Sequence, residues 1–531
     1  MTTNNEKMVI AGTTIDMAKF PSISEDVITK TFLKFVDVAN TSTDRATFYN
    51  TKDEQAKSSN SIHQQLYSIN RGIYAVSLML DGITDNSKMV GIQNLLGSAE
   101  LTDRDRSLLP IDKETEVIAY LLTQLPVQRM LNLYADLKTN RINNSRTRRI
   151  IMLSILNSGN LEYWSVKYRN KVKDAIEHAT GKRYLSIIKS ILEKQEFSTK
   201  RLVFTQKESD IMKNVVFKYV HAQSETYVAE CLAFILGCKN VYTLPILKSF
   251  NDAKTDITKG NKLPREILEG IRSTYHKNAT TKEVLELTKE QLTTKEKMQV
   301  QQNAEKHGVK VDFDVTKQDV VGLYIHCYAN DNKVTPEILS ALKAKAKKSA
   351  ITSPLSYGKV AILIDGSGSS IGNKTQHLRP IATALAIRDL LAATAETSVI
   401  EYAGGTVTDD GLVIPNGETN LAGGVLRLMK QSPDALFIIS DGYENAPAGR
   451  VNEVIEALRK IGIDTPIFQI SPVMAGEVGG VKKLSNHISV LPVSKPEAIG
   501  FSMIKAMIEQ SAKDGIIGLF NITLPKLALK R

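Results

Sequence analysis

The sequence predicts two kinds of structure in one chain: an α-helical domain over residues 25–348 and an α/β domain over residues 355–531. Three observations lead to this fold class. Apolar residues recur at three- and four-residue spacing through most of the first part, which is typical of amphipathic helices. Short apolar strands alternate with helical segments in the second part, which is typical of a parallel sheet. Between them, a Lys-rich stretch at 343–348 runs into a polar stretch with a proline at 349–354, where we place the domain boundary.

The length and composition indicate a protein of several domains that belongs in the cytoplasm. A chain of 531 residues is too long for one hydrophobic core. Cys231, Cys238 and Cys327 are widely separated and show no metal-ligand spacing, as expected of reduced thiols. The first residues lack the apolar core of a secretory signal, and no stretch reaches the roughly 18 apolar residues of a membrane-spanning helix. The formal net charge of +11 is compatible with a polyanionic partner.

The first part of the chain predicts an array of helical hairpins. Residues 1–24 show no clear periodicity, and we expect them to form an N-terminal arm. From residue 25 onward, short amphipathic segments are separated by turn signals, which favours a HEAT-like arrangement, although no repeat of fixed period is present. The clearest predicted helices are Thr115–Leu137, Ile150–Leu156, Tyr163–His178, Tyr184–Leu192, Tyr227–Leu236, Pro264–Tyr275, Thr281–Leu287 and Pro336–Lys347.

The second part predicts a doubly wound, Rossmann-like sheet that is mostly parallel, because strands and helices alternate along the chain. The predicted strands are Val360–Ile364, Thr397–Tyr402, Ala435–Ile439, Pro466–Ile470 and Ile488–Leu491, with a hairpin over Thr406–Ile414. The predicted helices are Leu378–Ala395, Leu421–Lys430, Arg450–Ile461 and Pro496–Glu509.

Oxygen-bearing side chains from three separate stretches are expected to meet at the carboxyl edge of this sheet. One group follows the first strand, one residue precedes the helix that begins at Leu421, and one carboxylate follows the third strand, and all three places lie on the same edge of a parallel sheet. Carboxylate and hydroxyl oxygens suit Mg²⁺, or Mn²⁺, better than zinc. Part of the coordination sphere stays open for the carboxylate or phosphate of a partner. The predicted ligands are Asp365, Ser367, Ser369, Thr419 and Asp441.

The order of these ligands resembles that of von Willebrand factor A domains with a metal-ion-dependent adhesion site (MIDAS). The shared elements are D-x-S-x-S after the first strand, an isolated Thr further on and Ser-Asp-Gly after a later strand, and they lie within residues 355–515. The resemblance implies that Asp365, Ser367 and Ser369 form the first ligand loop, Thr419 the second and Asp441 the third. The sequence departs from the family pattern at Ser370, because a large residue such as Met is common at that position in the family.

Three other interpretations of the same stretch remain open from the sequence. The segment 368–372 matches G-x-S-x-G, the nucleophile elbow of α/β-hydrolases, with Asp441 and His487 as candidate partners. The segment 366–375 is similar to a phosphate-binding loop, but Asn373 interrupts its G-K-[ST] core. The stretch could also be a Gly/Ser turn without a metal. We prefer the metal site because it gives a role to all five oxygen ligands.

A basic cluster lies in the helical domain between residues 138 and 189. Only Glu162, Asp174 and Glu177 oppose its twelve cations, and aromatic residues, among them Trp164 and Tyr184, are interleaved with them. Cations for phosphates beside flat rings for bases are what single-stranded RNA or DNA needs, whereas the alternative is a solvated face over an aromatic core. The cations are Lys138, Arg141, Arg146, Arg148, Arg149, Lys167, Arg169, Lys171, Lys173, Lys182, Arg183 and Lys189, of which all but Lys189 are candidate RNA contacts.

A helical domain joined to a metal-site A domain resembles the Ro ribonucleoprotein (TROVE plus A domain) family. The resemblance implies a closed HEAT-like ring that binds small non-coding RNA on a basic outer face and single-stranded ends of misfolded RNA in its hole. We therefore expect a non-enzymatic, RNA-binding ribonucleoprotein component whose A domain docks a protein partner through Mg²⁺. The alternative is an adaptor of a MoxR-type AAA+ ATPase, because helical domains also precede A domains in the partners of those ATPases.

Overall fold

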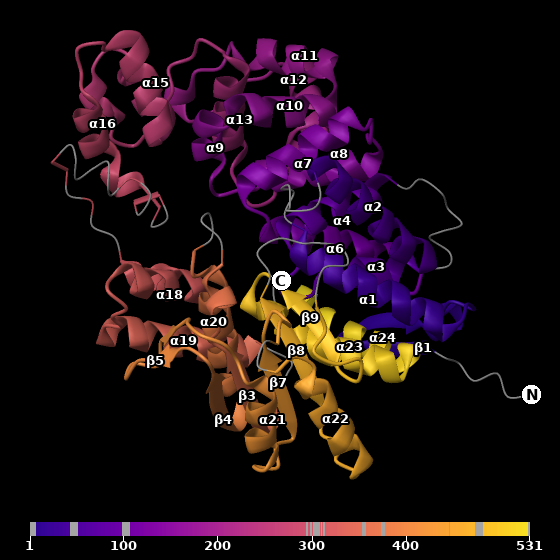
Figure 1. The fold of residues 1–531 in the computed structure, drawn as a ribbon. Helices are drawn as coiled ribbons and strands as arrows, with labels where there is room; N and C mark the ends of the chain where they lie inside the picture. The colour runs from indigo at the N-terminus through magenta and orange to yellow at the C-terminus, as the bar shows by residue number, and fades with distance from the viewer. Residues whose placement is uncertain are drawn as a thin grey trace, which may run out of the picture. The chain divides into compact units, whose positions relative to one another are not determined.

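The computed structural model describes residues 7–42, 51–97, 107–293, 296–297, 300, 308–309, 311, 314–352, 357–372, 377–444, 447–472 and 482–528. The chain is mostly helical and contains one five-stranded parallel sheet, which confirms the predicted fold class (Figure 1). It divides into two compact units. Unit 1 comprises Met1–Leu121 and Thr316–Arg531, and unit 2 comprises Leu122–Val315. These units differ from the predicted domains at 25–348 and 355–531, because the first helices of the chain pack with the sheet.

The sheet of unit 1 has the order β4-β3-β7-β8-β9, and every neighbouring pair is parallel. β3 lies inside the sheet, between β4 and β7, and its C-terminal two thirds are buried, as its near-continuous apolar sequence predicts. Ile362 of β3 lies opposite Ile400 of β4 and Phe437 of β7. The strands are β3 (Tyr357–Asp365), β4 (Ala395–Ala403), β7 (Ala435–Ile439), β8 (Ile467–Pro472) and β9 (Ser489–Val493), and β5 (Thr406–Val407) and β6 (Val413–Ile414) form a separate hairpin.

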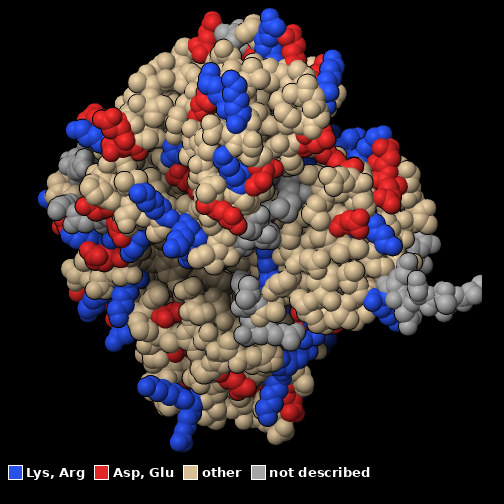
Figure 2. Space-filling view, turned by 90° about the horizontal axis from the view of Figure 1, so that it is seen from below, with Lys and Arg blue, Asp and Glu red and all other residues tan. Residues whose placement is uncertain are grey.

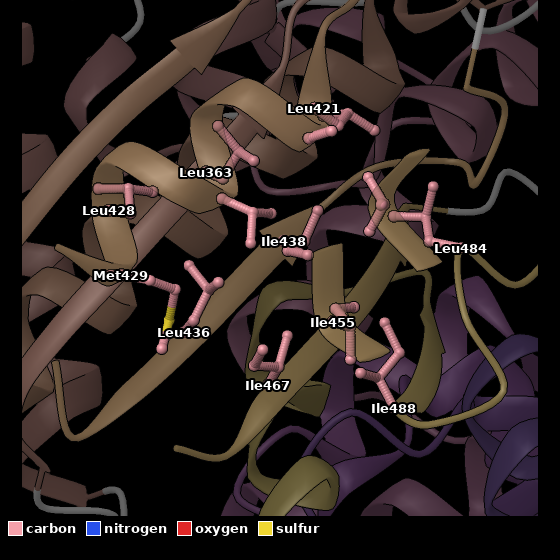
Figure 3. Close-up of a cluster of buried hydrophobic side chains, with 14 of the residues drawn as sticks. Leu363, Leu421, Leu428, Met429, Leu436, Ile438, Ile455, Ile467, Leu484 and Ile488 are labelled. Atoms are coloured by element: carbon pink, nitrogen blue, oxygen red, sulfur yellow. The ribbon is translucent and has the colours of Figure 1, made fainter. Parts of the chain in front are cut away.

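Helices cover both faces of this sheet, as a doubly wound fold requires. α21 (Leu421–Met429) and α22 (Arg450–Lys460) pack on one face, where Leu363, Leu436 and Ile438 meet residues of both helices in a buried apolar cluster (Figure 3). Each fully buried Leu or Ile of this cluster contributes roughly 1.5–3 kcal/mol to folding. α20 (Arg379–Thr394), which is buried over most of its length, also packs against strands of the sheet.

The remaining helices of unit 1 come from both ends of the chain. α1 packs against β9, α23 and α24. Lys505 of α23 donates to Asp37 of α1 at 2.6 Å, and Thr29 donates to the Ile508 carbonyl at 3.2 Å. These helices are α1 (Glu25–Thr41), α2 (Lys52–Ile69), α3 (Arg71–Ser77), α4 (Asp85–Gly97), α6 (Ile111–Gln124, which runs into unit 2), α18 (Val320–Ala329), α19 (Pro336–Thr352), α23 (Gly500–Gln510), α24 (Ala512–Thr523) and α25 (Pro525–Ala528).

Unit 2 is built from short helices that pack pairwise, as the turn signals predict. α10 lies against α7, α8 and α11, and α13 lies against α9. The helices are α7 (Val127–Thr139), α8 (Ser145–Leu156), α9 (Leu161–Lys167), α10 (Arg169–Thr180), α11 (Lys182–Leu192), α12 (Gln206–Val215), α13 (Glu225–Leu236), α14 (Pro245–Asp252), α15 (Arg265–Tyr275) and α16 (Thr281–Thr288).

Two helices that the sequence predicts as continuous are broken. The predicted helix Thr115–Leu137 ends with α6 and resumes as α7 after Pro126, because proline lacks an N–H and disfavours helix in the residue before it. The predicted helix Tyr163–His178 breaks at Tyr168, whose φ of −122° leaves the helical region between α9 and α10.

The predicted linker and arm also contain regular structure. Residues 349–352 continue α19 rather than forming a linker, because Ser and Ala tolerate a helix, and the helix ends shortly before Pro354. Within the first 24 residues, β1 (Lys7–Ile10) and β2 (Thr13–Asp16) form an antiparallel hairpin whose Ile15 is fully buried. Among the residues that the structure describes, no helix is both long enough and apolar enough to cross a membrane.

Candidate metal site and candidate nucleic-acid surface

The end of β3 carries the first ligand loop. The Asp365 carboxylate is 2% exposed and accepts two hydrogen bonds, from the Ser367 N–H to Oδ1 at 3.0 Å and from the Ser440 hydroxyl to Oδ2 at 2.7 Å. The hydroxyls of Ser367 and Ser369 lie 2.9 Å apart. Three of the predicted oxygens therefore form one compact group directly after the strand.

The loop before α21 is fastened to the β3 loop by backbone hydrogen bonds. The Gly368 N–H donates to the Gly417 carbonyl at 3.3 Å, and the Asn416 N–H donates to the Gly366 carbonyl at 3.0 Å. Gly366 also lies close to the turn after β4, because a Cβ there would lie 2.6 Å from the Gly404 carbonyl oxygen. Thr419 follows two residues later and is thereby held beside the β3 loop.

The Thr419 side chain carries an unmatched polar atom. Thr419 is completely buried, and its Oγ1 has no hydrogen-bond partner among the residues that the structure describes. A buried hydroxyl without a partner is destabilising unless a bound group satisfies it, and such groups call for an explanation. An oxygen ligand waiting for a cation provides one, so Thr419 fits the metal site.

Asp441 reaches the same edge through its neighbour Ser440, the residue that bonds Asp365. The half-buried Asp441 accepts the Tyr443 N–H at 3.0 Å, which fixes the turn after β7. Gly442 is required in that turn because its φ is +86° and a Cβ would lie 2.0 Å from the Lys482 carbonyl oxygen. The three stretches that the sequence predicts to meet are thus linked to one another.

The electrostatics of this edge favour a cation. Burial raises the pKa of Asp365, the hydrogen bonds from Ser440 and Ser367 lower it, and the nearby charge of Asp441 raises it again. Two carboxylates held close together in a largely buried place are stabilised by a divalent ion. No group of three His, Cys, Asp or Glu side chains with metal-ligand geometry is found in the described part of the chain. The candidate site differs from such groups because three of its five ligands are hydroxyls.

The hydrolase interpretation of segment 368–372 gains no support from the contacts of its residues. The Ser370 hydroxyl donates to the Asp365 carbonyl at 3.0 Å. His487 is exposed and its Nε2 lies 3.5 Å from Glu456 of α22. Neither residue makes the hydroxyl-to-imidazole contact that a nucleophile requires. The phosphate-loop interpretation depends on residues 373–375, which lie outside the described residues.

The basic residues of unit 2 fall into two groups, of which the first is engaged within the unit. Lys167 lies 3.1 Å from Glu296 and 3.7 Å from Glu266, and its Nζ sits over the Tyr163 and Tyr168 rings. Burial lowers the pKa of Lys167, but its bonds to Tyr163 and Glu296 outweigh burial and raise it.

Other cations of this group also have partners inside the unit. Arg169 stacks on Phe234 at 4.9 Å and donates to the Ile235 carbonyl. Lys171 donates to Asn132 at 2.7 Å. Arg146 is half-buried at the start of α8. Lys138 and Lys189 are paired with Glu177 and Glu193, at 3.8 and 3.6 Å.

The second group is exposed and gathers at one end of α8, α10 and α11. Asn143 of the α7–α8 loop donates to the His178 carbonyl at 3.0 Å, and His178 Nε2 lies 2.9 Å from the Ile142 carbonyl oxygen. These bonds hold Arg141, next to Ile142, near the turn between α10 and α11. Asn143 also accepts a hydrogen bond from Arg148 at 2.8 Å.

We call this group the basic corner. Its residues are exposed, and none of them forms an ion pair with a carboxylate among the described residues. Tyr184 beside it is 48% exposed, whereas Tyr163, Trp164 and Tyr168 are half-buried. Lys173 of α10 is also exposed, and it has no carboxylate partner in the part of the chain that the structure describes. The basic corner consists of Arg141, Arg148, Arg149, Lys182 and Arg183.

Charge is distributed differently elsewhere on the surface. Figure 2 views the molecule from below Figure 1, and on that face Lys and Arg are intermixed with Asp and Glu. Such a mixed surface provides little net attraction for a polyanion.

The sequence signal that predicts the basic corner is the cluster of cations between residues 138 and 189. The structure shows which of these cations are exposed and which are engaged within the unit.

Comparisons with known proteins do not show a family for this chain. No protein-family model matches the chain, and no curated protein matches it. The crystal structure of the Deinococcus radiodurans RO (RSR) protein is similar to it, with a TM-score of 0.47 and 13% sequence identity, over 89% of this chain and 98% of that one.

Proposed function

We propose that this protein binds RNA through the basic corner of unit 2 and acts as a component of a ribonucleoprotein. The observation that carries the proposal is the set of exposed cations around the α10–α11 turn, which have no carboxylate partners among the described residues. Guanidinium groups form paired hydrogen bonds with phosphate, and clustered cations release counterions from a nucleic-acid backbone. The proposed ligands are small non-coding RNA and single-stranded or misfolded RNA, and the role is binding rather than catalysis.

The geometry of the corner supports contact with successive phosphates. Arg148 is oriented by its bond to Asn143, and Lys182 and Arg183 begin α11, so their side chains project from a fixed backbone. Tyr184 lies next to them with about half of its surface free, and a base can stack on such a ring. Preorganised cations lose less conformational freedom on binding than flexible ones.

The experiment is a titration of fluorescently labelled small RNA with the full-length chain, followed by anisotropy at low salt. The variant Lys182→Glu/Arg183→Glu is expected to weaken binding at least tenfold, because two attractive charges become repulsive. The matched control is Lys430→Glu/Lys460→Glu, which makes the same charge change at exposed positions of unit 1. Equal losses in both variants would show non-specific electrostatics, and the proposed surface would then be wrong.

We also propose that unit 1 holds Mg²⁺, or Mn²⁺, at the edge of its sheet and uses it to dock a partner. The residues that would hold the ion are Asp365, Ser367, Ser369, Thr419 and Asp441, and the buried, unpartnered Thr419 hydroxyl supports this set. The bound ion would supply a positive centre for an anionic group of the partner. Asp365 stays oriented for this role by the Ser440 hydroxyl.

A second proposed role, as an adaptor of an AAA+ ATPase, depends on the same metal site. The two roles separate on purification from cells. Bound nucleic acid, seen as a high ratio of absorbance at 260 nm to that at 280 nm, supports the RNA role. An ATPase that co-purifies in a Mg²⁺-dependent manner, without RNA, supports the adaptor role.

A further inference from the structure

Strand β4 ends the sheet of unit 1 without a neighbour on its outer side. Among the described strands it pairs with β3 alone, while β5 and β6, which follow it in the chain, form their own hairpin. β4 lies at the border of the sheet in Figure 1. In the described part of the chain, no backbone hydrogen bond joins the outer edge of β4 to another segment. Glu396, Thr397, Ser398 and Ile400 are exposed.

Most of the usual protections of an edge strand are missing from β4, whose only charged residues are Glu396 and Glu401. Edge strands are commonly shielded by charged side chains, above all Lys, by Pro, by a bulge or by being very short. β4 reads Ala-Glu-Thr-Ser-Val-Ile-Glu-Tyr-Ala and has nine residues, without Lys or Pro. Its register with β3 is unbroken, from Ala395 opposite Tyr357 to Ala403 opposite Asp365. An edge strand of nine residues with an unbroken register can form backbone hydrogen bonds with an added strand.

The sequence of β4 is complementary to itself in the antiparallel direction. When two copies of β4 pair about a two-fold axis normal to the sheet, the residue at the axis lies opposite the same residue of the other copy. All nine residues of both strands are paired when that residue is Val399, the middle residue of β4. In this register Glu396 lies opposite Tyr402, and Glu401 lies opposite Thr397. Ser398 then lies opposite Ile400. No like charges therefore lie opposite each other across the two strands. Within each copy, Glu401 forms an ion pair with Arg427 of α21.

We propose that β4 pairs antiparallel with β4 of a second copy of this chain, about a two-fold axis at Val399. The two sheets then form one continuous sheet of twice the width, and the open backbone groups of both edges become hydrogen-bonded. The contact is narrow, so the dimer is a weak one that forms at high protein concentration. This inference is independent of RNA binding and of the metal site.

Opposite substitutions at one exposed position test the register. Thr397→Lys places a cation opposite Glu401 of the other copy, and Thr397→Glu places a like charge there. Because each change occurs twice in the symmetric dimer, the first is expected to lower the dimer dissociation constant and the second to raise it, each by about tenfold. The measurement is sedimentation velocity of the full-length chain over a wide concentration series, with the fold of each variant checked by circular dichroism.

A second readout identifies the contacting strand. Hydrogen exchange of the β4 amides is expected to slow as the concentration of the wild-type chain rises, while exchange in the buried strand β7 stays the same. A chain that remains monomeric at the highest concentration overturns the proposal. A dimer that leaves β4 exchange unchanged, or that responds in the same direction to both Thr397 variants, overturns it as well.

Discussion

The Ser440 hydroxyl donates a hydrogen bond to Asp365 Oδ2 at 2.7 Å, and this bond joins the ends of β7 and β3 at the candidate metal site. Asp365 is thereby held in place before any ion binds. Thr419 in the neighbouring loop is equally buried, but its hydroxyl has no hydrogen-bond partner within the described part of the chain. The Asp365 carboxylate therefore has hydrogen-bond donors within the protein, whereas the Thr419 hydroxyl has no partner among the described residues.

Thr419→Val is expected to separate metal binding from folding. Without metal, the variant should be as stable as the wild type or more stable by about 1 kcal/mol, because a buried hydroxyl without a partner is replaced by a methyl group. With saturating Mg²⁺, the wild type should gain several degrees in Tm and the variant much less. Thermal unfolding with Mg²⁺ and with EDTA measures both effects.

Ser440→Ala is the matched control, because Ser440 supports Asp365 but is not among the predicted ligands. It should lower the stability of the metal-free protein by about 1 kcal/mol and keep most of the Mg²⁺ response. An unchanged Mg²⁺ response in Thr419→Val would remove Thr419 from the ligand set.

The buried charged pair Arg71–Glu114 of unit 1 is expected to be costly to break by removing one partner. Both side chains are 1% exposed, and Arg71 also donates to Glu114 Oε1 at 2.7 Å and to the Tyr67 hydroxyl at 2.7 Å. Glu114→Leu should cost about 3–5 kcal/mol, because it leaves the guanidinium buried without its carboxylate. Arg71→Met/Glu114→Leu should cost clearly less than the single change. Urea unfolding of the two variants tests this, and a double variant that is the less stable of the two contradicts it.

The buried histidine His63 is expected to make unit 1 sensitive to acid. Burial lowers the pKa of His63 to about 3, and the ring lies between Phe35 and Tyr74. The unfolded chain takes up a proton near its ordinary value of about 6.5, so stability is complete above that pH and falls as the pH drops toward 3. The expected loss is on the order of 1.4 kcal/mol per pH unit within this window.

His63→Phe is the test of that pH dependence, since the new ring keeps the aromatic contacts and cannot be protonated. Hydrogen exchange of α1 and α2 between pH 7 and pH 5, corrected for intrinsic rates, compares the variant with the wild type. The wild type should lose protection as the pH falls and the variant should lose less. If both lose it equally, His63 is not the responsible group.

The sequence predicted which side chains meet at the edge of the sheet more completely than it predicted which cations are exposed. Asp365 and Asp441 follow apolar strands, and the geometry of a parallel sheet brings the ends of such strands together. The support from Ser440 was present in the Ser-Asp-Gly motif, but only the structure shows that its hydroxyl points back to Asp365. In the basic cluster, Lys167 and Arg169 flank the break at Tyr168, and a break changes which side chains face inward.

Local sequence patterns could not predict which segments of the chain make up each of the two units. Helical periodicity identifies α1 and α2 as amphipathic, but it does not identify the surface that their apolar faces cover. The contacts between α1 and α23, such as that between Asp37 and Lys505, join residues that are far apart in the chain. Such pairings depend on the whole fold, so the change in sequence pattern near residue 350 does not coincide with the division of the chain into two compact units.

The salt dependence of RNA binding should distinguish the basic corner from the internal cations. Arg149→Ala removes an exposed charge and should reduce the slope of log K against log salt by about 0.7 for a single-stranded RNA. Lys167→Met should lower the stability of unit 2, because Glu296 and Glu266 lose their partner, and should leave the slope unchanged. Titrations at several salt concentrations provide both slopes, and a reduced slope in Lys167→Met contradicts its assignment as an internal residue.

RNA binding at the basic corner is the central claim, and the anisotropy titration at low salt tests it most directly. The wild-type chain and Lys430→Glu/Lys460→Glu should bind the labelled small RNA with similar dissociation constants, whereas Lys182→Glu/Arg183→Glu should bind at least tenfold more weakly. Absence of RNA binding by the wild type, or full binding by Lys182→Glu/Arg183→Glu, would contradict the proposed function.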